Sequence, residues 1–296
     1  MKKIGIIGLS EGNGHPYSWS AAFNGYNVDV MKDCPYPVIP QYLSQQNFPH
    51  DAIRDAKVSH IWTQDKYLSK HIAKASYINN IVEDYKEMIG KVDAILLARD
   101  DYKNHVKMSL PFIQAGLPIF IDKPISISKK DIDQIFEHEQ YNGQIFTASI
   151  TSGAKEFKLS SNETNKIGKL EYIDATVMKR WDKYAIHIIE PVLNLIGEQG
   201  KIVSHDTLKT KEKTILSLHW ESGLVTTFSS LGEIPTPISI RLFGEKNHKE
   251  LVFLDTFYAL KATLQRFIDI IQKKEDPLNK NKVYQIVDII ERGLHK

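Results

Sequence analysis

Short apolar runs alternate with helix-length segments through the first part of the chain. Four such runs, at residues 3–8, 57–63, 92–98 and 119–121, each end at polar or glycine residues. Runs of this length, separated by segments long enough for a crossover helix, are typical of buried parallel strands. The pattern therefore predicts an α/β fold with a doubly wound parallel sheet in a first domain over residues 1–124.

The pattern changes after residue 142. Strands with turns between them are expected at residues 144–150, 170–178, 214–219, 224–229 and 238–243, separated in places by irregular links such as residues 160–169. This succession predicts an open, mostly antiparallel sheet in a second, α+β domain over residues 125–296. Two helices are expected at residues 257–273 and 282–295, and these final helices are candidates to pack back on the first domain.

A glycine-rich turn follows the first strand and precedes a helix expected at residues 18–23. It reads Gly8-Leu9-Ser10-Glu11-Gly12-Asn13-Gly14-His15-Pro16. Backbone N–H groups in such a turn can approach a pyrophosphate, which indicates a dinucleotide-binding Rossmann domain. The G-x-G-x-x-G register has Ser10 and Asn13 where glycines are expected, so either the loop takes a longer route or it is a structural turn. The candidate cofactor-binding residues of this loop are Gly8, Ser10, Gly12, Asn13 and Gly14.

The second strand ends in Trp62-Thr63-Gln64-Asp65. An acid that binds the ribose hydroxyls usually ends this strand of a Rossmann domain. Asp65 is therefore a candidate for that contact, and Thr63 and Gln64 are the less charged alternatives. The absence of an adjacent arginine favours NAD slightly over NADP and leaves both open.

A lysine ends the last predicted strand of the first domain, in Ile119-Phe120-Ile121-Asp122-Lys123-Pro124. Pro124 cannot donate to a sheet and disfavours helix at Lys123, so the strand stops there. Ligands of open α/β sheets bind beyond the carboxyl ends of the strands. A partly desolvated Lys123 can hydrogen-bond a substrate oxygen and stabilise its developing charge, and the alternative is a lysine that only reaches water.

A helix is expected within residues 181–197, because Ile186, Ile189, Leu193 and Ile196 recur at helical spacing. On a neighbouring face, Lys183, His187 and Glu190 follow each other at i, i+4 and i+7. A histidine is suited to proton transfer near neutral pH, and a satisfied core or surface histidine is the alternative. His187-x-x-Glu190 is a two-ligand spacing with no visible third ligand, so no metal is expected.

Composition narrows the class of protein. A chain of 296 residues with 42% hydrophobic and 25% charged residues is typical of a soluble globular protein, and its net charge of +2 argues against binding nucleic acid or acidic membrane. Residues 25–55 are rich in proline and aromatic side chains without clear periodicity, which predicts an irregular excursion. The single cysteine, Cys34, excludes an intrachain disulfide and suits a cytoplasmic location.

The glycine turn, the strand ending in Asp122-Lys123-Pro124 and the later His187 helix together resemble the Gfo/Idh/MocA family of glucose–fructose oxidoreductase and inositol dehydrogenase. Lys123 matches the lysine of that family's E-K-P motif, and Lys183 through Glu190 match its D-x-G-x-H-x-x-D helix. The resemblance implies an NAD(P)-binding Rossmann domain followed by an open-sheet domain. It also implies a homodimer or homotetramer assembled through the second sheet.

The resemblance further implies a hydride transfer to or from a secondary hydroxyl of a sugar, sugar acid or nucleotide sugar. His187 would exchange the hydroxyl proton and Lys123 would orient the hydroxyl, so these two are the catalytic candidates. Asp122, Lys123 and Arg99 are candidates for cofactor contact. The candidate substrate-binding residues are Arg180, Lys183, Tyr184 and Glu190, and the basic ones favour an anionic substrate.

Several positions depart from the family's motifs. Asp122 replaces a glutamate, Lys183 the motif aspartate and Ala185 a glycine, while Glu190 replaces the final aspartate and Arg99-Asp100 a Thr-Pro pair. Asp182, Tyr184 and Glu190 are the alternative candidates to stand in for the motif aspartate. These departures keep two alternatives open. One is a catalytically silent relative that binds dinucleotide or sugar as a sensor or partner-binding protein. The other is a member that uses tightly held NAD for elimination or hydrolysis.

Overall fold

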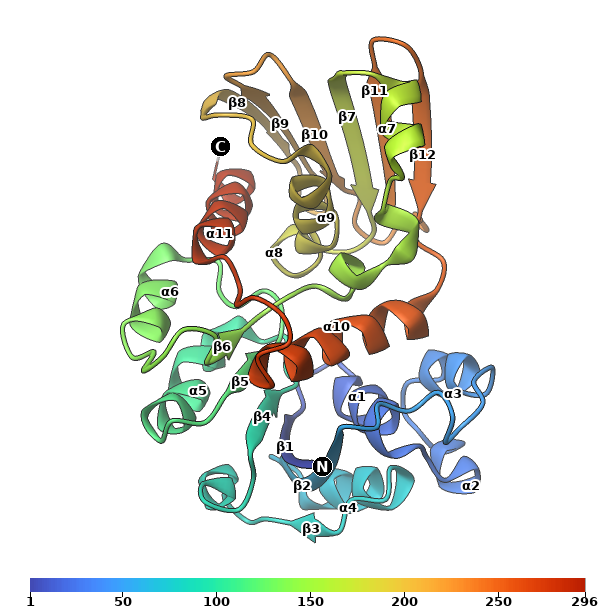
Figure 1. The fold of residues 1–296 in the computed structure, drawn as a ribbon, viewed down its shortest axis with the longest axis vertical. Coiled ribbons are helices and arrows are strands. Elements are labelled where there is room, and N and C mark those ends of the chain that lie inside the picture. Colours follow the sequence, from blue (N-terminus) through green and yellow to red (C-terminus); the bar gives the residue numbers. More distant parts are fainter. Residues whose placement is uncertain (296) are drawn as a thin grey trace. The chain divides into compact units, whose positions relative to one another are not determined.

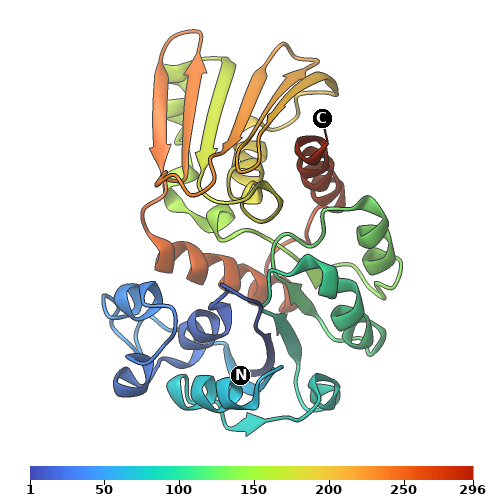
Figure 2. The same ribbon diagram turned by 180° about the vertical axis from the view of Figure 1, so that it is seen from behind.

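The structure is a computed structural model and describes residues 1–295 (Figures 1 and 2). It divides into two compact units, each continuous in space but not in sequence. The first unit comprises residues 1–126, 130–148 and 260–279, and the second comprises residues 127–129, 149–259 and the chain from Lys280 onward. No helix within residues 1–295 is long and apolar enough to cross a membrane.

A six-stranded sheet forms the centre of the first unit, and all its strand pairs are parallel. Its strands are β1 (Lys2–Gly8), β2 (Ala56–Thr63), β3 (Asn80–Ile81), β4 (Ala94–Leu97), β5 (Ile119–Ile121) and β6 (Ile145–Phe146). Their order is β3-β2-β1-β4-β5-β6, which is the Rossmann order. The predicted doubly wound parallel sheet is therefore confirmed. The strand order reverses direction between β1 and β4, and ligands of such sheets bind beyond the carboxyl ends of the strands at this point.

Helices connect these strands. They are α1 (His15–Asn24), α2 (Val28–Met31), α3 (Val38–Leu43), α4 (Lys66–Ala75), α5 (His105–Gln114) and α6 (Lys129–Phe136). The segment at residues 25–55 thus contains two short helices where an irregular excursion was expected. Asn27 explains the first of them, because its side chain caps α2 by accepting hydrogen bonds from the N–H groups of Asp29 and Val30.

A row of aromatic rings from α1, β5, β6 and α10 packs together in the core of the first unit. Trp19 of α1 lies 4.7 Å from Phe120 of β5, and Phe120 lies 4.7 Å from Phe146 of β6, both measured between ring centroids. Phe146 in turn stacks at 5.8 Å on Phe267 of α10 (Thr256–Ile271). Aromatic pairs add about 0.5–1.5 kcal/mol each beyond their area burial. This row explains why part of α10 joins the first unit.

The pairing of β6 corrects one expectation. The strand expected at residues 144–150 was assigned to the second sheet, but Ile145–Phe146 pairs parallel to β5 in the first sheet. Gln144 fixes this register, since its carbonyl accepts from the N–H of Ile119 and its side-chain amide donates to the carbonyl of Ile113. A short apolar run does not reveal which of two sheets it joins.

The second unit contains another six-stranded sheet. Its strands are β7 (Leu170–Val177), β8 (Ile202–Lys209), β9 (Thr214–Trp220), β10 (Val225–Ser230), β11 (Ser239–Gly244) and β12 (His248–Val252), in the order β12-β11-β7-β10-β9-β8. All pairs are antiparallel except β10 with β7, so the predicted mostly antiparallel sheet is confirmed. The sequence did not predict β8 and β12. They are the two edge strands, and β8 is largely exposed, so it lacks the apolar alternation of a half-buried strand.

Helices cover one face of this second sheet. They are α7 (Ser161–Ile167), α8 (Trp181–Tyr184), α9 (Ile186–Ile196) and α11 (Lys280–Leu294). Figures 1 and 2 show α7 and α9 on the same side of the sheet, and the opposite face carries no helix of this unit. The apolar face predicted for α9 packs into the core through Ile189 and Leu193. The second unit is therefore a two-layer structure with one sheet face uncovered by its own helices.

Helix α7 lies where an irregular link was expected at residues 160–169. A capping box begins it: the Ser160 hydroxyl accepts from the N–H of Glu163, and the Glu163 carboxylate accepts from the N–H of Ser160. These reciprocal bonds satisfy two N–H groups that a helix start otherwise leaves unpaired. Gly168 ends the helix with φ of 79°, a conformation that favours glycine. The Ser-x-x-Glu spacing was the overlooked signal.

Candidate functional site

Three polar segments meet where neighbouring strands of the first sheet end. The glycine turn follows β1, Arg99-Asp100 follows β4, and Asp122-Lys123 follows β5. These strands are neighbours in the sheet and run parallel, so their carboxyl ends share one edge at the reversal of strand order. The structure therefore brings most of the predicted cofactor residues of the first unit to one place.

Lys123 is buried at this edge, with 3% of its surface exposed. Its ammonium nitrogen lies 3.8 Å from Oδ2 of Asp100. The other oxygen of Asp100 accepts a 2.7 Å hydrogen bond from the Ser10 hydroxyl, which itself accepts from the N–H of Asp100. A buried ammonium requires such a partner, because desolvation disfavours the charged form. Ser10, Asp100 and Lys123 thus join the ends of β1, β4 and β5.

Asp122 anchors a second polar cluster beside Lys123. Its Oδ2 lies 2.6 Å from Nδ1 of His15 and accepts a 3.1 Å hydrogen bond from Nδ2 of Asn13, while Oδ1 accepts from the N–H of Lys123 at 2.8 Å. Burial acts to raise the pKa of Asp122, but His15 and the hydrogen bonds outweigh it and hold that pKa well below its usual value. The ring of His15 stacks on Trp19 at 5.2 Å. Asp122 therefore stays ionised and ties the glycine turn to the end of β5.

The glycine turn is closely packed against the protein and carries backbone donors that an anionic group could use. A Cβ on Gly8 would lie 2.1 Å from Cγ of Pro16, and one on Gly14 would lie 2.5 Å from Cδ1 of Ile39. Within residues 1–295, the N–H groups of Gly12 and Gly14 donate no hydrogen bond, although Gly14 is buried. Gly14 is also the N-cap of α1, and its position carries no side-chain cap. Uncapped N–H groups at a helix start fit a pyrophosphate.

Gln64, which follows β2, and Arg99, which follows β4, support the loop after β1. The Gln64 side chain donates to the carbonyl of Leu9 at 2.6 Å and accepts from the N–H of Leu9 at 3.1 Å. Arg99 makes a bidentate pair with Asp101 at 2.6 and 2.7 Å and reaches Gln64 at 3.3 Å. Burial acts to raise the pKa of Asp101, but Arg99 and Asn104 lower it overall. The guanidinium of Arg99 is thus engaged by protein groups.

The candidates at the end of β2 have local structural partners. Asp65 is the N-cap of α4 and accepts a 2.7 Å hydrogen bond from the N–H of Tyr67. Thr63 donates to the carbonyl of Asp65 at 2.6 Å and contacts the Ser69 hydroxyl at 2.8 Å. These contacts fix the bend that follows β2. These contacts do not distinguish NAD from NADP.

In the second unit, the expected substrate-binding residues lie at the junction of α8 and α9. Arg180 precedes α8 and pairs with Asp182, with Nη2 at 2.8 Å from Oδ2. The Tyr184 hydroxyl accepts a 2.8 Å hydrogen bond from Nζ of Lys179. Lys183 is half-buried in the last turn of α8. Their roles toward a substrate remain predictions.

His187 and Glu190 are both buried on the first turns of α9, each 5% exposed. Nδ1 of His187 lies 2.5 Å from the Ser149 hydroxyl, and Oε2 of Glu190 accepts a 2.6 Å hydrogen bond from the N–H of Ser149. The ring of Tyr184 meets that of His187 edge-on at 5.4 Å. Helical spacing thus places His187 and Glu190 together, as the sequence indicated, against a residue that it did not identify.

Sequence reasoning missed several residues of these two clusters. His15 stood in the glycine turn and Asp100 after Arg99, so their positions at strand ends were a usable signal. Ser149 and Thr151 carried no such signal, because small hydroxyl residues occur throughout the chain. Only the fold brings Ser149 to His187, which lies 38 positions away.

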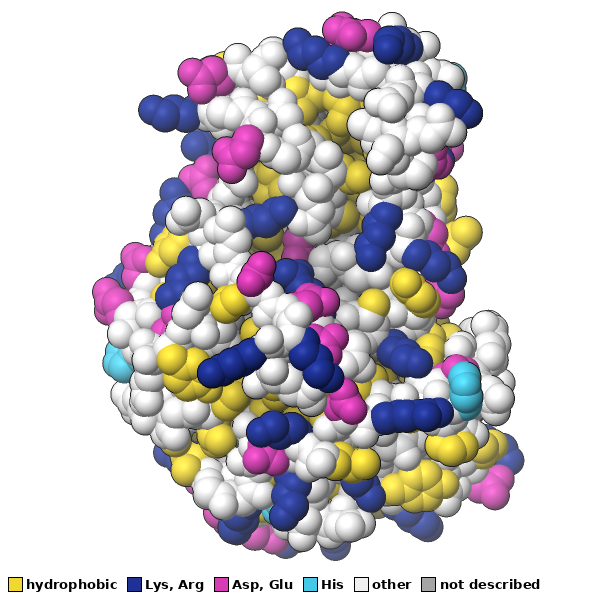
Figure 3. Space-filling model, viewed as in Figure 1, with side chains coloured by type: hydrophobic (Ala, Val, Ile, Leu, Met, Phe, Trp, Pro, Cys, Tyr) yellow, Lys and Arg dark blue, Asp and Glu magenta, His cyan; other side chains and the backbone are white. Residues whose placement is uncertain are grey.

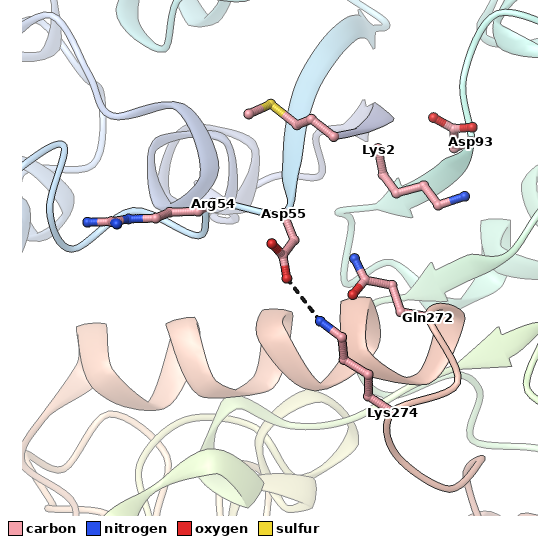
Figure 4. Close-up of a pocket in the computed structure, with 7 residues that line it drawn as sticks. Lys2, Arg54, Asp55, Asp93, Gln272 and Lys274 are labelled. Carbon is pink, nitrogen blue, oxygen red and sulfur yellow. Dashed lines mark hydrogen bonds and ion pairs between the residues drawn. The ribbon is translucent and has the colours of Figure 1, made fainter.

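A hollow of about 550 Å³ lies at the opposite, amino-terminal edge of the first sheet (Figure 4). Its lining residues precede or begin β1, precede β2 and β4, or follow α10, and Lys274 there pairs with Asp55 at 3.2 Å. Ligands of open α/β sheets bind at the carboxyl ends of strands, so this hollow is not the candidate active site. On the face drawn in Figure 3, basic and acidic side chains are interspersed. Residues 1–295 contain no group of three His, Cys, Asp or Glu side chains placed to hold a metal ion.

Comparison with known proteins agrees with the fold of the first unit. Residues 40–149 match the model of an oxidoreductase family with an NAD-binding Rossmann fold, Gfo/Idh/MocA. No curated protein matches the sequence.

Solved structures share the fold over nearly the whole chain. Myo-inositol 2-dehydrogenase from Lactobacillus plantarum is 14% identical with a TM-score of 0.74, over 99% of this chain and 96% of that one. A probable dehydrogenase from Thermotoga maritima is 16% identical with a TM-score of 0.73, over 97% and 94%. Scyllo-inositol dehydrogenase from Lactobacillus casei, solved with NAD(H) and scyllo-inositol, is 14% identical with a TM-score of 0.70, over 98% and 94%. The predicted resemblance is thereby confirmed: residues 40–149 match the model of the Gfo/Idh/MocA oxidoreductase family, and inositol dehydrogenases share the fold of nearly the whole chain.

Proposed function

We propose that this protein is an NAD(P)-dependent oxidoreductase that transfers a hydride to or from a secondary hydroxyl of a sugar, sugar acid or nucleotide sugar. The observation that carries the proposal is the buried Lys123 at the carboxyl edge of the first sheet, whose ammonium faces Asp100 and whose backbone N–H donates to Asp122. Burying an ammonium is costly, so a position that retains one with two neighbouring carboxylates supports a chemical role.

The glycine turn is the proposed site for the cofactor's pyrophosphate. The N–H groups of Gly12 and Gly14 would donate to it, since they donate to no acceptor within residues 1–295. Asp65, or Thr63 and Gln64 in its place, are proposed to contact the ribose, with a slight preference for NAD over NADP. When bound, the nicotinamide supplies or accepts the hydride.

Lys123 is proposed to orient the substrate hydroxyl and to stabilise the charge that develops on its oxygen. An ammonium in a site of low dielectric is effective for this purpose, because it needs little reorganisation during the reaction. Asp100 places a carboxylate oxygen 3.8 Å from the ammonium nitrogen of Lys123, and Asp122 holds the backbone of Lys123 by accepting from its N–H.

His187 is proposed to exchange the hydroxyl proton as general base or acid. An imidazole is suited to this exchange near neutral pH, and a positioned general base contributes about 10² to 10⁴-fold to a rate. Lys183 and Arg180 add positive charge around α8, which favours an anionic substrate such as a sugar acid. Inositols are also reasonable first substrates, because two dehydrogenases of the same fold are named for them.

The test is a steady-state assay of NADH and NADPH oxidation or formation. The substrate panel consists of inositols, hexoses, sugar acids and nucleotide sugars. Lys123→Met removes the charge while keeping a similar side-chain length, and His187→Asn removes the base. Each is expected to lower kcat by about 10²-fold or more on the substrate that the wild type turns over. Unchanged turnover in both variants would contradict the assignment.

The two alternatives give different results in the same assay. A catalytically silent relative would bind NADH tightly and leave every substrate unchanged. A member that uses retained NAD for elimination or hydrolysis would consume substrate with no net change in NADH absorbance. Product analysis by mass spectrometry separates this second case from a true absence of turnover.

A homodimer or homotetramer through the second sheet is also proposed, along with a cytoplasmic location suited to the lone, buried Cys34. The sheet face without helices carries partly exposed Tyr172 and Phe243, whose rings lie 5.7 Å apart. Exposed aromatic pairs on an open sheet face favour an interface. Light scattering of the purified protein is expected to give two or four chains, and Phe243→Asp is expected to shift the mass toward one.

A further inference from the structure

A closed ring of hydrogen bonds holds His187 in the second unit. Nδ1 of His187 lies 2.5 Å from the hydroxyl of Ser149, and that hydroxyl lies 2.7 Å from the hydroxyl of Thr151. The Thr151 hydroxyl lies 2.9 Å from the backbone carbonyl of His187, which closes the ring. Ser149 and Thr151 are fully buried, so neither hydroxyl exchanges these partners for bulk water.

The number of hydrogens in this ring fixes the direction of every bond. The carbonyl of His187 can only accept, so Thr151 donates its single hydroxyl hydrogen there. Thr151 therefore accepts from Ser149, which uses the single hydrogen of the Ser149 hydroxyl. With that hydrogen engaged, the Ser149 oxygen must accept from Nδ1 of His187. Ser149 also accepts from the N–H of Thr151 at 3.2 Å, so its oxygen is fully used.

We propose that Ser149 and Thr151 are positioning residues that hold neutral His187 with its hydrogen on Nδ1, so that Nε2 is its basic atom. The ring tautomer is thus set by two hydroxyl groups, whereas a carboxylate or a backbone carbonyl is the usual second partner of a functional histidine. A catalytic use of the basic Nε2 rests on the proposed function of His187, whereas the assignment of the tautomer rests only on the hydrogen bonds of the ring.

The surroundings of the ring support a fixed geometry. Ser149 begins the turn Ile150–Gly153 as its N-cap, and its own N–H donates to the buried Glu190 at 2.6 Å. Glu190 and His187 lie one turn apart on α9, so the carboxylate holds the backbone of Ser149 while the hydroxyl holds the imidazole. The neighbouring Tyr184 ring packs edge-on against that imidazole. The backbone N–H and the hydroxyl of Ser149 are therefore both held by side chains of α9.

The same count of hydrogens argues against a nucleophilic role for Ser149. A serine activated by histidine must donate its hydroxyl hydrogen to the imidazole. Here that hydrogen goes to Thr151, and the Ser149 side chain is fully buried. The short contact between Ser149 and His187 is thus an orienting contact.

The test uses Thr151→Val, which removes the hydroxyl while keeping the side-chain shape, with Thr151→Ser as the matched control that keeps the hydroxyl. Nitrogen-15 NMR of protein labelled at its histidines reports which ring nitrogen carries the hydrogen. The spectra are recorded at rising pH until the ring of His187 is neutral, and the signals missing in His187→Asn are those of His187. The wild type and Thr151→Ser are expected to carry it on Nδ1. In Thr151→Val the Ser149 hydrogen is released to bond Nδ1, so the signal is expected to move to a mixture or to protonated Nε2.

Protonated Nε2 in the neutral wild type would overturn the inference, and so would a Thr151→Val spectrum identical to the wild type. Circular dichroism and NADH titration show whether each variant is folded and still binds cofactor. If a substrate is found, Thr151→Val is expected to lower kcat by about 10-fold to 10²-fold with unchanged NADH affinity, and Thr151→Ser to preserve it. A wild type with Nδ1 protonated but no turnover of any substrate would leave the inference standing and refute the proposed function.

Discussion

Asp122→Asn tests whether the carboxylate cluster at the end of β5 organises the candidate cofactor site. In the wild type, Oδ2 of Asp122 faces two donors, Nδ1 of His15 at 2.6 Å and Nδ2 of Asn13 at 3.1 Å. An amide oxygen in the place of Oδ2 could still accept from both, but the amide NH2 would then face the N–H of Lys123, which donates to Oδ1 in the wild type, and the negative charge would be lost. The substitution therefore removes a buried, hydrogen-bonded carboxylate while changing the side-chain volume very little.

The size of the effect follows from burial. Losing a buried, charged hydrogen-bond acceptor costs about 1.5–3 kcal/mol. Asp122 is 1% exposed but the His15 side chain is 24% exposed, so solvent screens this contact in part and the expected loss is about 2 kcal/mol. Asp33→Asn, at an exposed position of the same unit, is expected to change the stability by less than about 0.5 kcal/mol.

The effect also has a defined pH dependence. The pKa of Asp122 is lowered in the folded protein, so its ionised form stabilises the fold above the ordinary Asp pKa of about 3.9 and this contribution is lost as the pH falls through the folded value. The difference between wild type and Asp122→Asn is therefore expected to be constant from neutral pH to about pH 4 and to shrink below it. Native-state hydrogen exchange of α1 and β5 amides measures the difference. A difference under about 0.5 kcal/mol at neutral pH, or one unchanged by acid, would refute the reasoning.

Three further substitutions test separate parts of the structure. Gly8→Ala would place a Cβ 2.1 Å from the ring of Pro16 and is expected to weaken NADH binding at least about tenfold, and unchanged affinity in a fluorescence titration would contradict this. Gly293→Ala would place a Cβ 2.2 Å from the ring of Trp181. It is expected to lower the free energy of unfolding of the second unit by about 1–3 kcal/mol, measured by urea unfolding. An unchanged free energy of unfolding would contradict this and would mean that α11 shifts without cost. Ser160→Ala is expected to cost about 1 kcal/mol through loss of the α7 cap, with Ser160→Asp retaining most of it.

The sequence predicts most of the first unit, because its buried parallel strands appear as apolar runs that end at chemically distinct residues. Lys123 and the glycine turn stand at such ends, and this position alone indicates that they meet at one edge. Strand β6 was misassigned since two apolar residues fit either sheet equally well. Strands β8 and β12 were missed because edge strands bury too little surface to show a pattern.

The candidate site was only partly predictable. Helical periodicity places His187 and Glu190 together, since a helix repeats within four residues. His15 pairs with Asp122 across 107 positions of sequence, and Ser149 pairs with His187 across 38. Such contacts depend on the relative placement of strand ends, which local propensity does not encode. The polar residues that hold the functional candidates are therefore the part that requires the structure.

The most direct test of the account is a fluorescence titration of the purified wild-type protein with NADH and NADPH, alongside Gly8→Ala and Lys123→Ala. The account predicts saturable, micromolar binding of at least one of the two dinucleotides by the wild type, with a clear loss of affinity in Gly8→Ala. Binding of neither dinucleotide by a protein shown to be folded would contradict the cofactor site at the glycine turn and, with it, the proposed oxidoreductase activity.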